Sequence, residues 1–219
     1  MRTLETSFAI INKSINAYLS KNDMTSAKSH TLLAALVFSA LTEAKFSKLI
    51  HTPYAFDIGE IEEIKRQPNI SSKWKKAVSI GIGNIKTSCK SNYKINLLLN
   101  IERLIETHIT EPSKIRNKIA HGQWAKALNS DNTQVNTQLT TAVLNLDCVE
   151  VLKWKITYDH FYSIVNDIVQ SPNKAHFRDY HIHVVELESY LKKAENYSLN
   201  DKISALQKKR KGCTEIVFT

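Results

Sequence analysis

Glycine and proline are scarce in this chain, and their scarcity limits the folds that it can adopt. Only five Gly and four Pro occur among its 219 residues. A β-sandwich needs many tight turns, and tight turns favour these two residues. The sequence therefore predicts long helices joined by few turns, in a chain long enough to bury one main core.

Apolar residues recur at intervals of three or four along most of the chain, which is the spacing of a helix face. Residues 3–20 show the pattern, and so do residues 151–168, behind an Asp147 that can cap the first turn. Further helices are expected over residues 29–51, 58–65, 73–80, 92–108, 174–197 and 200–210.

Residues that favour turns or caps are expected to separate these helices. Ser29 or Thr31 can cap the second helix, and the Gly-Ile-Gly-Asn segment at 81–84 predicts a joint. Alternating apolar residues predict at most one small β-hairpin near residues 123–139. We therefore expect an all-α bundle over residues 1–172, with a C-terminal helical extension over residues 173–219 packed on or beside it.

The sequence contains no membrane span and no signal peptide that we can recognise. The longest apolar run, residues 32–41, is interrupted by Ser39 and is too short to cross a bilayer. Three widely spaced cysteines suggest neither a disulfide framework nor a zinc ribbon. A cytoplasmic protein without a membrane partner is expected.

Positive charge is concentrated in one segment. The net charge is +9, and residues 64–101 contain eight basic residues and no acidic one. Such a patch favours a polyanion, because each neutralised phosphate releases condensed counterions. The alternative is a solvated lysine face. The candidate phosphate-binding residues are Lys73, Lys75, Lys76, Lys86, Lys90 and Lys94.

Several kinds of chemistry are disfavoured by the motifs that are absent. His181 and His183 would face apart on a helix and no Cys lies near them, so a metal site is not expected. The sequence contains no Gly-x-Ser-x-Gly, Walker or Cys–His signature. No metal or other cofactor is therefore expected.

Arg116 and His121 form the candidate catalytic pair. On an uninterrupted helix they would point about 140° apart. Gly122 favours a helix end at this point, because Gly accepts positive φ, and His121 can then swing back towards Arg116. Glu43 shares a predicted helix face with Leu36 and Ile50, so its carboxylate is expected on the apolar side.

This pair suits RNA cleavage without a metal. The reaction needs a base for the 2′-hydroxyl proton, an acid for the leaving oxygen and a cation beside the phosphorane. His can take either proton role and Arg the third. Because one His cannot fill both proton roles in one step, we expect a symmetric dimer. In the structural alternative, Arg116 pairs with Glu43 and His121 only caps its helix.

The segment Arg116-Asn117-Lys118-Ile119-Ala120-His121 resembles the R-x(4–6)-H motif of HEPN domains, and the likeness extends over about residues 25–170. It implies a metal-independent endoribonuclease with a composite site in a homodimer, in toxin, phage-defence or RNA-processing systems. Arg116 and His121 would be catalytic, Asn117 a supporting polar group and Glu43 the upstream acid. Toxins that are silenced by nucleotidylation resemble R-x4-H-x-Tyr, whereas this chain has Gln123 at the position of the Tyr. That mode of control is therefore not expected here.

Three functions follow as hypotheses. The first is a dimeric RNA endonuclease that uses the lysine segment to hold RNA, with an antitoxin or sensor protein as a candidate partner. The second is a non-catalytic HEPN-type module for dimerisation or for binding a nucleotide or RNA. The third is a basic RNA-binding protein whose binding weakens steeply with salt.

Overall fold

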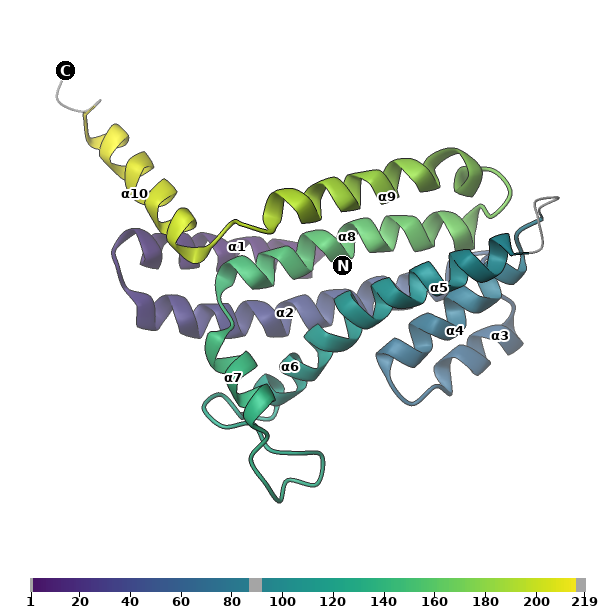
Figure 1. Cartoon of the computed structure of the whole chain (residues 1–219), viewed down its shortest axis with the longest axis horizontal. Helices are drawn as coiled ribbons and strands as arrows, with labels where there is room; N and C mark the ends of the chain where they lie inside the picture. Colours follow the sequence, from purple (N-terminus) through teal and green to yellow (C-terminus); the bar gives the residue numbers. More distant parts are fainter. Residues whose placement is uncertain (1, 87–91, 216–219) are drawn as a thin grey trace. The chain divides into compact units, whose positions relative to one another are not determined.

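The computed structural model describes residues 2–86 and 92–215, and the regular structure in these ranges is helical (Figure 1). This confirms the all-α fold class. The elements are α1 (Arg2–Ser20), α2 (Met24–Ile50), α3 (Ile58–Lys65), α4 (Ile70–Gly83), α5 (Tyr93–Ile105), η1 (Glu106–Thr110), α6 (Glu111–Ala120), α7 (Thr137–Asn145), α8 (Cys148–Gln170), α9 (Ala175–Ala194) and α10 (Leu199–Glu215).

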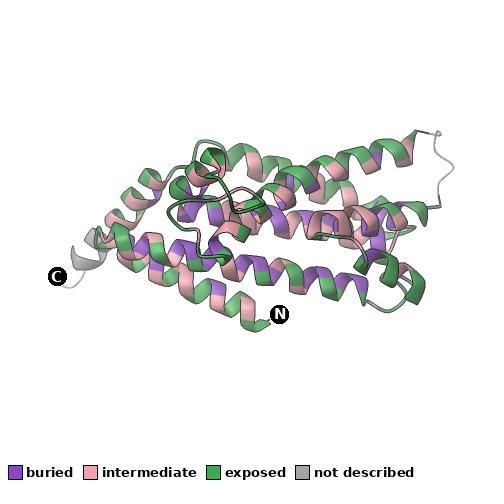
Figure 2. Cartoon of the chain, turned by 90° about the horizontal axis from the view of Figure 1, so that it is seen from below, coloured by how far each residue is buried: buried purple, intermediate pink, exposed green. Residues whose placement is uncertain are grey.

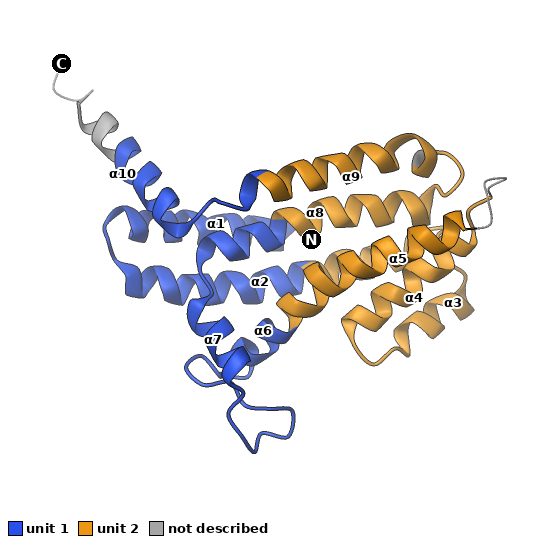
Figure 3. Ribbon diagram, in the orientation of Figure 1, with its two compact units in different colours: residues 1–41, 114–155, 193–219 blue, residues 42–113, 156–192 orange. Residues whose placement is uncertain are grey.

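The contacts divide the chain into two compact units (Figure 3). The first unit comprises residues 1–41, 114–155 and 193–219, and the second comprises residues 42–113 and 156–192. The predicted division at residue 172 stays a prediction. Within the predicted extension, most of α9 belongs to the second unit and α10 to the first.

In the first unit, α1 buries one apolar face. Phe8, Ile15 and Leu19 are buried, as their spacing predicts. Buried and exposed residues alternate along the helices in the manner of amphipathic segments (Figure 2). α10 packs against α1, and the Gln207 Nε2 donates to the Asn22 Oδ1 at 3.0 Å.

α2 begins earlier than the sequence suggests. Its first turn is capped by Asp23, whose Oδ1 accepts a hydrogen bond from the Ser26 N–H at 3.0 Å. The predicted cap at Ser29 or Thr31 is therefore wrong. Thr31 lies inside the helix, where its hydroxyl donates to the Ala27 carbonyl at 2.8 Å.

Trp74 of α4 lies in the core of the second unit and has no exposed surface. Its ring centroid is 4.7 Å from that of Phe46 and 5.0 Å from that of Phe161. Tyr158 lies at its edge, 6.2 Å away, and donates its hydroxyl to the Thr42 carbonyl at 2.8 Å. This aromatic cluster joins α4 to the parts of α2 and α8 that belong to the second unit.

Gly81 allows α4 to approach α8 closely. A Cβ at this position would lie 3.1 Å from the Val169 Cγ2 and 3.4 Å from the Ile168 Cγ2. The predicted joint at residues 81–84 is wrong, because Gly81 and Gly83 both lie within α4. The absence of a side chain serves helix packing here and does not mark a turn.

α5, η1 and α6 follow one another without a break in helical structure. The middle element, η1, is a π-helix, and the Glu111 N–H donates to the Glu106 carbonyl. Pro112 has no N–H to give to the carbonyl four residues earlier, so the wider π turn accommodates a proline that would disrupt a regular α-helix.

Candidate active site

α6 ends in a closed turn that confirms the predicted role of Gly122. Gly122 has φ +73°. Its N–H donates to the Ile119 carbonyl at 3.1 Å, and the Gln123 N–H donates to the Lys118 carbonyl at 2.9 Å. This pair of bonds is the Schellman motif. It gives the segment after His121 a defined path.

The predicted catalytic side chains leave α6 on different faces. His121 and Asn117 are exposed, whereas Arg116 is half-buried. The His121 N–H still donates to the Asn117 carbonyl at 3.1 Å, so the chain follows the helix up to His121 and turns after it. Arg116 and His121 therefore point about 140° apart, and Asn117 and His121 about 40° apart. This backbone does not support a swing of His121 towards Arg116.

The predicted hairpin is reduced to a single antiparallel bridge between Leu128 and Val135. Beyond it, the Asn136 Oδ1 accepts from the Leu139 N–H at 2.9 Å and caps α7. The second predicted strand is therefore wrong from residue 137 onward, because Asn is a strong N-cap and starts a helix there.

Two side chains hold this loop to the end of α6. The Trp124 Nε1 donates to the Ile119 carbonyl at 2.9 Å, and the Gln123 Oε1 accepts from the Leu128 N–H at 2.7 Å. Trp124 nevertheless remains 41% exposed. The turn that follows His121 thus has a fixed geometry and presents an aromatic surface.

Glu43 is exposed, so the prediction that its carboxylate lies on the apolar side is wrong. Of the two residues predicted to share its face, Ile50 is buried and Leu36 is only half-buried, and Leu33 elsewhere on α2 is exposed. Leucines occur on both the buried and the exposed sides of α2, so Leu36 did not mark the core. Glu43 belongs to the second unit and Arg116 to the first, and their pairing stays a prediction.

The predicted phosphate-binding lysines belong to the second unit where they are described. They are Lys73, Lys75 and Lys76 on α4, Lys86 after it and Lys94 on α5, while Lys90 lies outside the described residues. Lys86 is exposed, and the half-buried Lys94 donates its Nζ to the Gly83 carbonyl at 2.8 Å.

Two of these lysines are paired with acids from outside the basic segment. The Lys75 Nζ lies 3.5 Å from the Glu106 Oε2, and the Lys76 Nζ lies 2.5 Å from the Glu63 Oε1. The surface is therefore less uniformly positive than the linear sequence suggests. The fold brings together charges that are distant in sequence, and local composition does not reveal this.

The Glu106 carboxylate also belongs to a polar cluster that sequence reasoning missed. The Thr110 hydroxyl lies 2.8 Å from the Ser71 Oγ and 3.2 Å from the Glu106 Oε2. This cluster joins the first turn of α4 to η1. Ser71 and Thr110 are 39 residues apart in the sequence, so their contact could not be identified without the fold.

The histidines near α9 have separate partners. The His176 Nε2 and the Tyr93 hydroxyl share a hydrogen bond of 2.7 Å. The His183 Nε2 lies 3.4 Å from the Asp167 Oδ2, and burial raises the pKa of Asp167 while His183 opposes that shift. In the part of the chain that is described, no three His, Cys, Asp or Glu side chains gather as metal ligands would.

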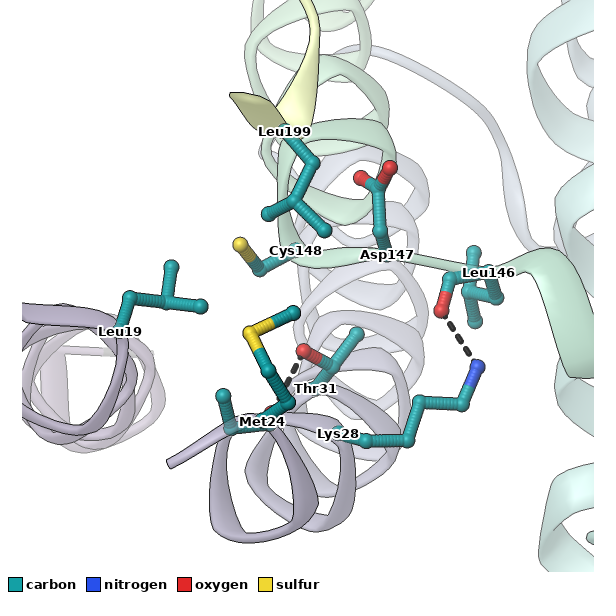
Figure 4. A pocket seen from close by; sticks show the side chains of 9 residues that line it. Leu19, Met24, Lys28, Thr31, Leu146, Asp147, Cys148 and Leu199 are labelled. Carbon is teal, nitrogen blue, oxygen red and sulfur yellow. Dashed lines mark hydrogen bonds between the residues drawn. The ribbon is translucent and has the colours of Figure 1, made fainter. Parts of the chain in front are cut away.

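A small cavity of about 60 Å³ lies in the first unit (Figure 4). Its wall is mostly apolar and includes Leu19, Met24, Cys148 and Leu199. Burial raises the pKa of the Cys148 thiol, so the thiol is held in its unreactive neutral form. The cavity is best understood as an imperfection of packing.

Of the helices in residues 2–86 and 92–215, none has the length and apolar character that crossing a bilayer requires.

Comparison of the chain with protein-family models, curated proteins and solved structures finds no match.

Proposed function

We propose that this chain is a metal-independent endoribonuclease that acts as a homodimer in the cytoplasm. The observation that carries the proposal is the closed end of α6, which exposes His121 and Asn117 on one face and bears Arg116 on the same helix. An imidazole exchanges protons near neutral pH, and a guanidinium stabilises the charge of a phosphorane.

A second copy of the chain completes the site in this proposal. Because Arg116 and His121 point about 140° apart within one chain, one copy alone does not assemble the site in this proposal. An isologous interface through α6 supplies two imidazoles and two guanidinium groups. Asn117, beside His121, orients the RNA.

The reaction divides the proton transfers between the two copies. One His121 removes the 2′-hydroxyl proton, and the oxygen attacks the adjacent phosphorus. The bond from phosphorus to the 5′-oxygen breaks, and the second His121 protonates that oxygen. The products carry a 2′,3′-cyclic phosphate and a 5′-hydroxyl. Basic side chains of the second unit, with Lys73 and Lys86 foremost, hold the RNA backbone.

The test is cleavage of RNA by purified protein in the presence of a chelator, with analysis of the product ends. We expect cyclic phosphate ends from the wild type and a loss of cleavage of at least about a hundredfold in Arg116→Ala and in His121→Ala. The exposed Arg103 and His181 supply matched controls, Arg103→Ala and His181→Ala. Unchanged cleavage in both site variants would overturn the proposal.

A second function is favoured by the separation of Arg116 and His121 on α6. If no partner copy brings them together, the chain is a non-catalytic module for dimerisation or for binding a nucleotide or RNA. It would then dimerise without cleaving RNA, and His121→Ala would leave dimerisation and binding unchanged.

A nuclease of this kind, acting as a toxin, phage-defence or RNA-processing effector, needs restraint, and an antitoxin or sensor protein is the proposed partner. Expression of the unrestrained wild type in a bacterial host is expected to stop growth and degrade RNA. His121→Ala should permit growth. Equal growth arrest by the two proteins would show that toxicity does not arise from this site.

A further inference from the structure

We infer that the indole ring of Trp124 is a stacking platform for an unpaired nucleobase next to the phosphate on which His121 acts. The inference rests on the proposed function for the identity of that phosphate. It assigns the substrate class: RNA that is single-stranded at the cleavage point.

The ring is held in one orientation by its own polar atom. The Trp124 Nε1 donates to the Ile119 carbonyl at 2.9 Å, and the same carbonyl accepts the Gly122 N–H at 3.1 Å. The indole is therefore tied to the last turn of α6, the turn that leads into His121. A ring fixed in this way loses little conformational freedom when a base stacks on it.

The ring is also accessible. Trp124 is 41% exposed. Because its N–H is already hydrogen-bonded, burial of the rest of the apolar ring would be favourable, yet the ring remains exposed. The neighbouring side chain of Gln123 is occupied by the Leu128 N–H, at 2.7 Å. The turn after His121 thus presents a partly exposed aromatic side chain whose N–H is hydrogen-bonded to α6.

Positive charge lies on the chain to either side of this ring. Lys114 on α6 and Lys126 in the loop are both exposed. Lys114 lies seven residues before His121, so the two side chains leave α6 within about 20° of one another. Proteins that bind single strands combine aromatic side chains with cations of this kind, because bases stack on the ring while the cations contact the backbone.

The geometry favours unpaired RNA over a duplex. Within a duplex both faces of each base are covered by neighbouring bases, and a protein ring reaches only a base that has left the stack. Trp124 comes three residues after His121, a chain distance of at most about 11 Å. A base beside the reacting phosphate can therefore reach the ring.

The experiment measures tryptophan fluorescence of the full chain during titration with 2′-O-methyl oligoadenylate, which lacks the attacking hydroxyl and is not cleaved. Of the three tryptophans, Trp74 is fully buried and Trp154 is half-buried. We expect quenching in the wild type and in the control Trp154→Phe, and none in Trp124→Leu. The oligonucleotide annealed to its complement should not quench.

Binding strength gives a second readout through the anisotropy of a labelled oligonucleotide. Trp124→Leu should bind about five- to hundredfold more weakly, the range found for loss of one stacked base. Trp124→Phe keeps an aromatic face without the anchoring N–H and should bind within a few-fold of the wild type. If Trp124→Leu disturbs the loop, Trp124→Phe still tests whether an aromatic ring is needed for binding.

The outcomes separate this inference from the proposed function. Quenching that persists in His121→Ala, whether or not the wild type cleaves RNA, supports the platform. Cleavage by the wild type without quenching overturns the platform and leaves the nuclease intact. Equal loss of binding in Trp124→Phe and Trp124→Leu shows that the residue only anchors the loop, and this also overturns the inference.

Discussion

The Lys28 ammonium group lies 2.6 Å from the carbonyl oxygen of Leu146, just beyond the end of α7 (Figure 4). It also donates to the carbonyls of Val143 and Leu144, at 3.0 and 2.8 Å. The last carbonyls of a helix have no N–H partner within it, so a side chain of α2 caps α7. Burial lowers the pKa of Lys28 from its ordinary value, and Asp147 opposes that shift.

The first prediction concerns this cap. We expect Lys28→Met to lower the free energy of unfolding by about 1–3 kcal/mol, because three carbonyls lose a charged donor. Lys13→Met, at an exposed position of α1, is the control and should change it by less than about 0.5 kcal/mol. Denaturation by urea measures both. Equal stability of the two variants would mean that water replaces the ammonium group without cost.

The second prediction compares two glycines that have open space around them. A Cβ at Gly122 or at Gly83 would meet no atom within 4 Å, but Gly122 has φ +73°. Gly122→Ala should therefore destabilise the chain by about 1–2 kcal/mol through backbone strain. Gly83→Ala should stabilise it by about 0.5–1 kcal/mol, because it lies in a helix. A stable Gly122→Ala would show that the turn can take another form.

The third prediction concerns pH. His176 is 1% exposed, and burial lowers its pKa below the ordinary value of 6.5, with a further contribution from His181. Burial also lowers the pKa of His108. The unfolded chain then binds more protons than the folded chain, so the free energy of unfolding should fall as pH decreases below 6.5.

The measurement is a series of denaturation curves between about pH 5 and 7, where histidine titrates. His176→Gln keeps a polar partner for Tyr93 but does not titrate, and its stability should depend less on pH than that of the wild type. His51→Gln, at an exposed position, is the control. Parallel pH profiles for wild type and His176→Gln would contradict the assignment.

The fourth prediction distinguishes the lysines by their partners. Lys75 and Lys76 pair with acids, whereas within the described residues Lys73 and Lys86 have no acidic partner. Replacing Lys73 and Lys86 by Ala should lower the salt dependence of RNA binding by about 0.7 per lost phosphate contact. Replacing Lys75 and Lys76 should change it less. Equal effects from the two pairs would show that Glu106 and Glu63 do not compete with RNA.

The fifth prediction tests the dimer site. Wild type and His121→Ala are co-expressed with different tags, and cleavage is measured against the fraction of wild-type chains. If each site needs both imidazoles, an equal mixture keeps about a quarter of the activity, because a quarter of dimers carry two intact copies. Independent chains would keep about half. A linear dependence would therefore exclude the composite site.

Local sequence was sufficient to predict two of the helix ends. Asp147 caps α8, as predicted, by accepting from the Glu150 N–H at 2.9 Å, and Gly122 ends α6 as its position indicates. Errors arose where tertiary packing decided the outcome. Gly81 looks like a turn residue in sequence, but it is helical because Val169 lies against it.

The local structure around the candidate site was predicted in part, whereas the roles of its residues stay predictions. The end of α6 follows from its own residues, and the exposure of His121 and Asn117 agrees with a surface site. The exposure of Glu43 could not be foreseen, since apolar residues occur around most of α2. The acids beside Lys75 and Lys76 come from other elements, and only the fold brings them together.

The contact between Gly81 and Val169 has a consequence for the charges on α4. Because Gly81 has no side chain, α4 packs closely against α8 on the face that carries Gly81. A rotation of α4 about its own axis would bring a larger residue into this contact. Lys73, Lys75 and Lys76 share this helix, so their directions are fixed with it. Gly81, which has no side chain, thus determines the directions in which the three lysines leave α4.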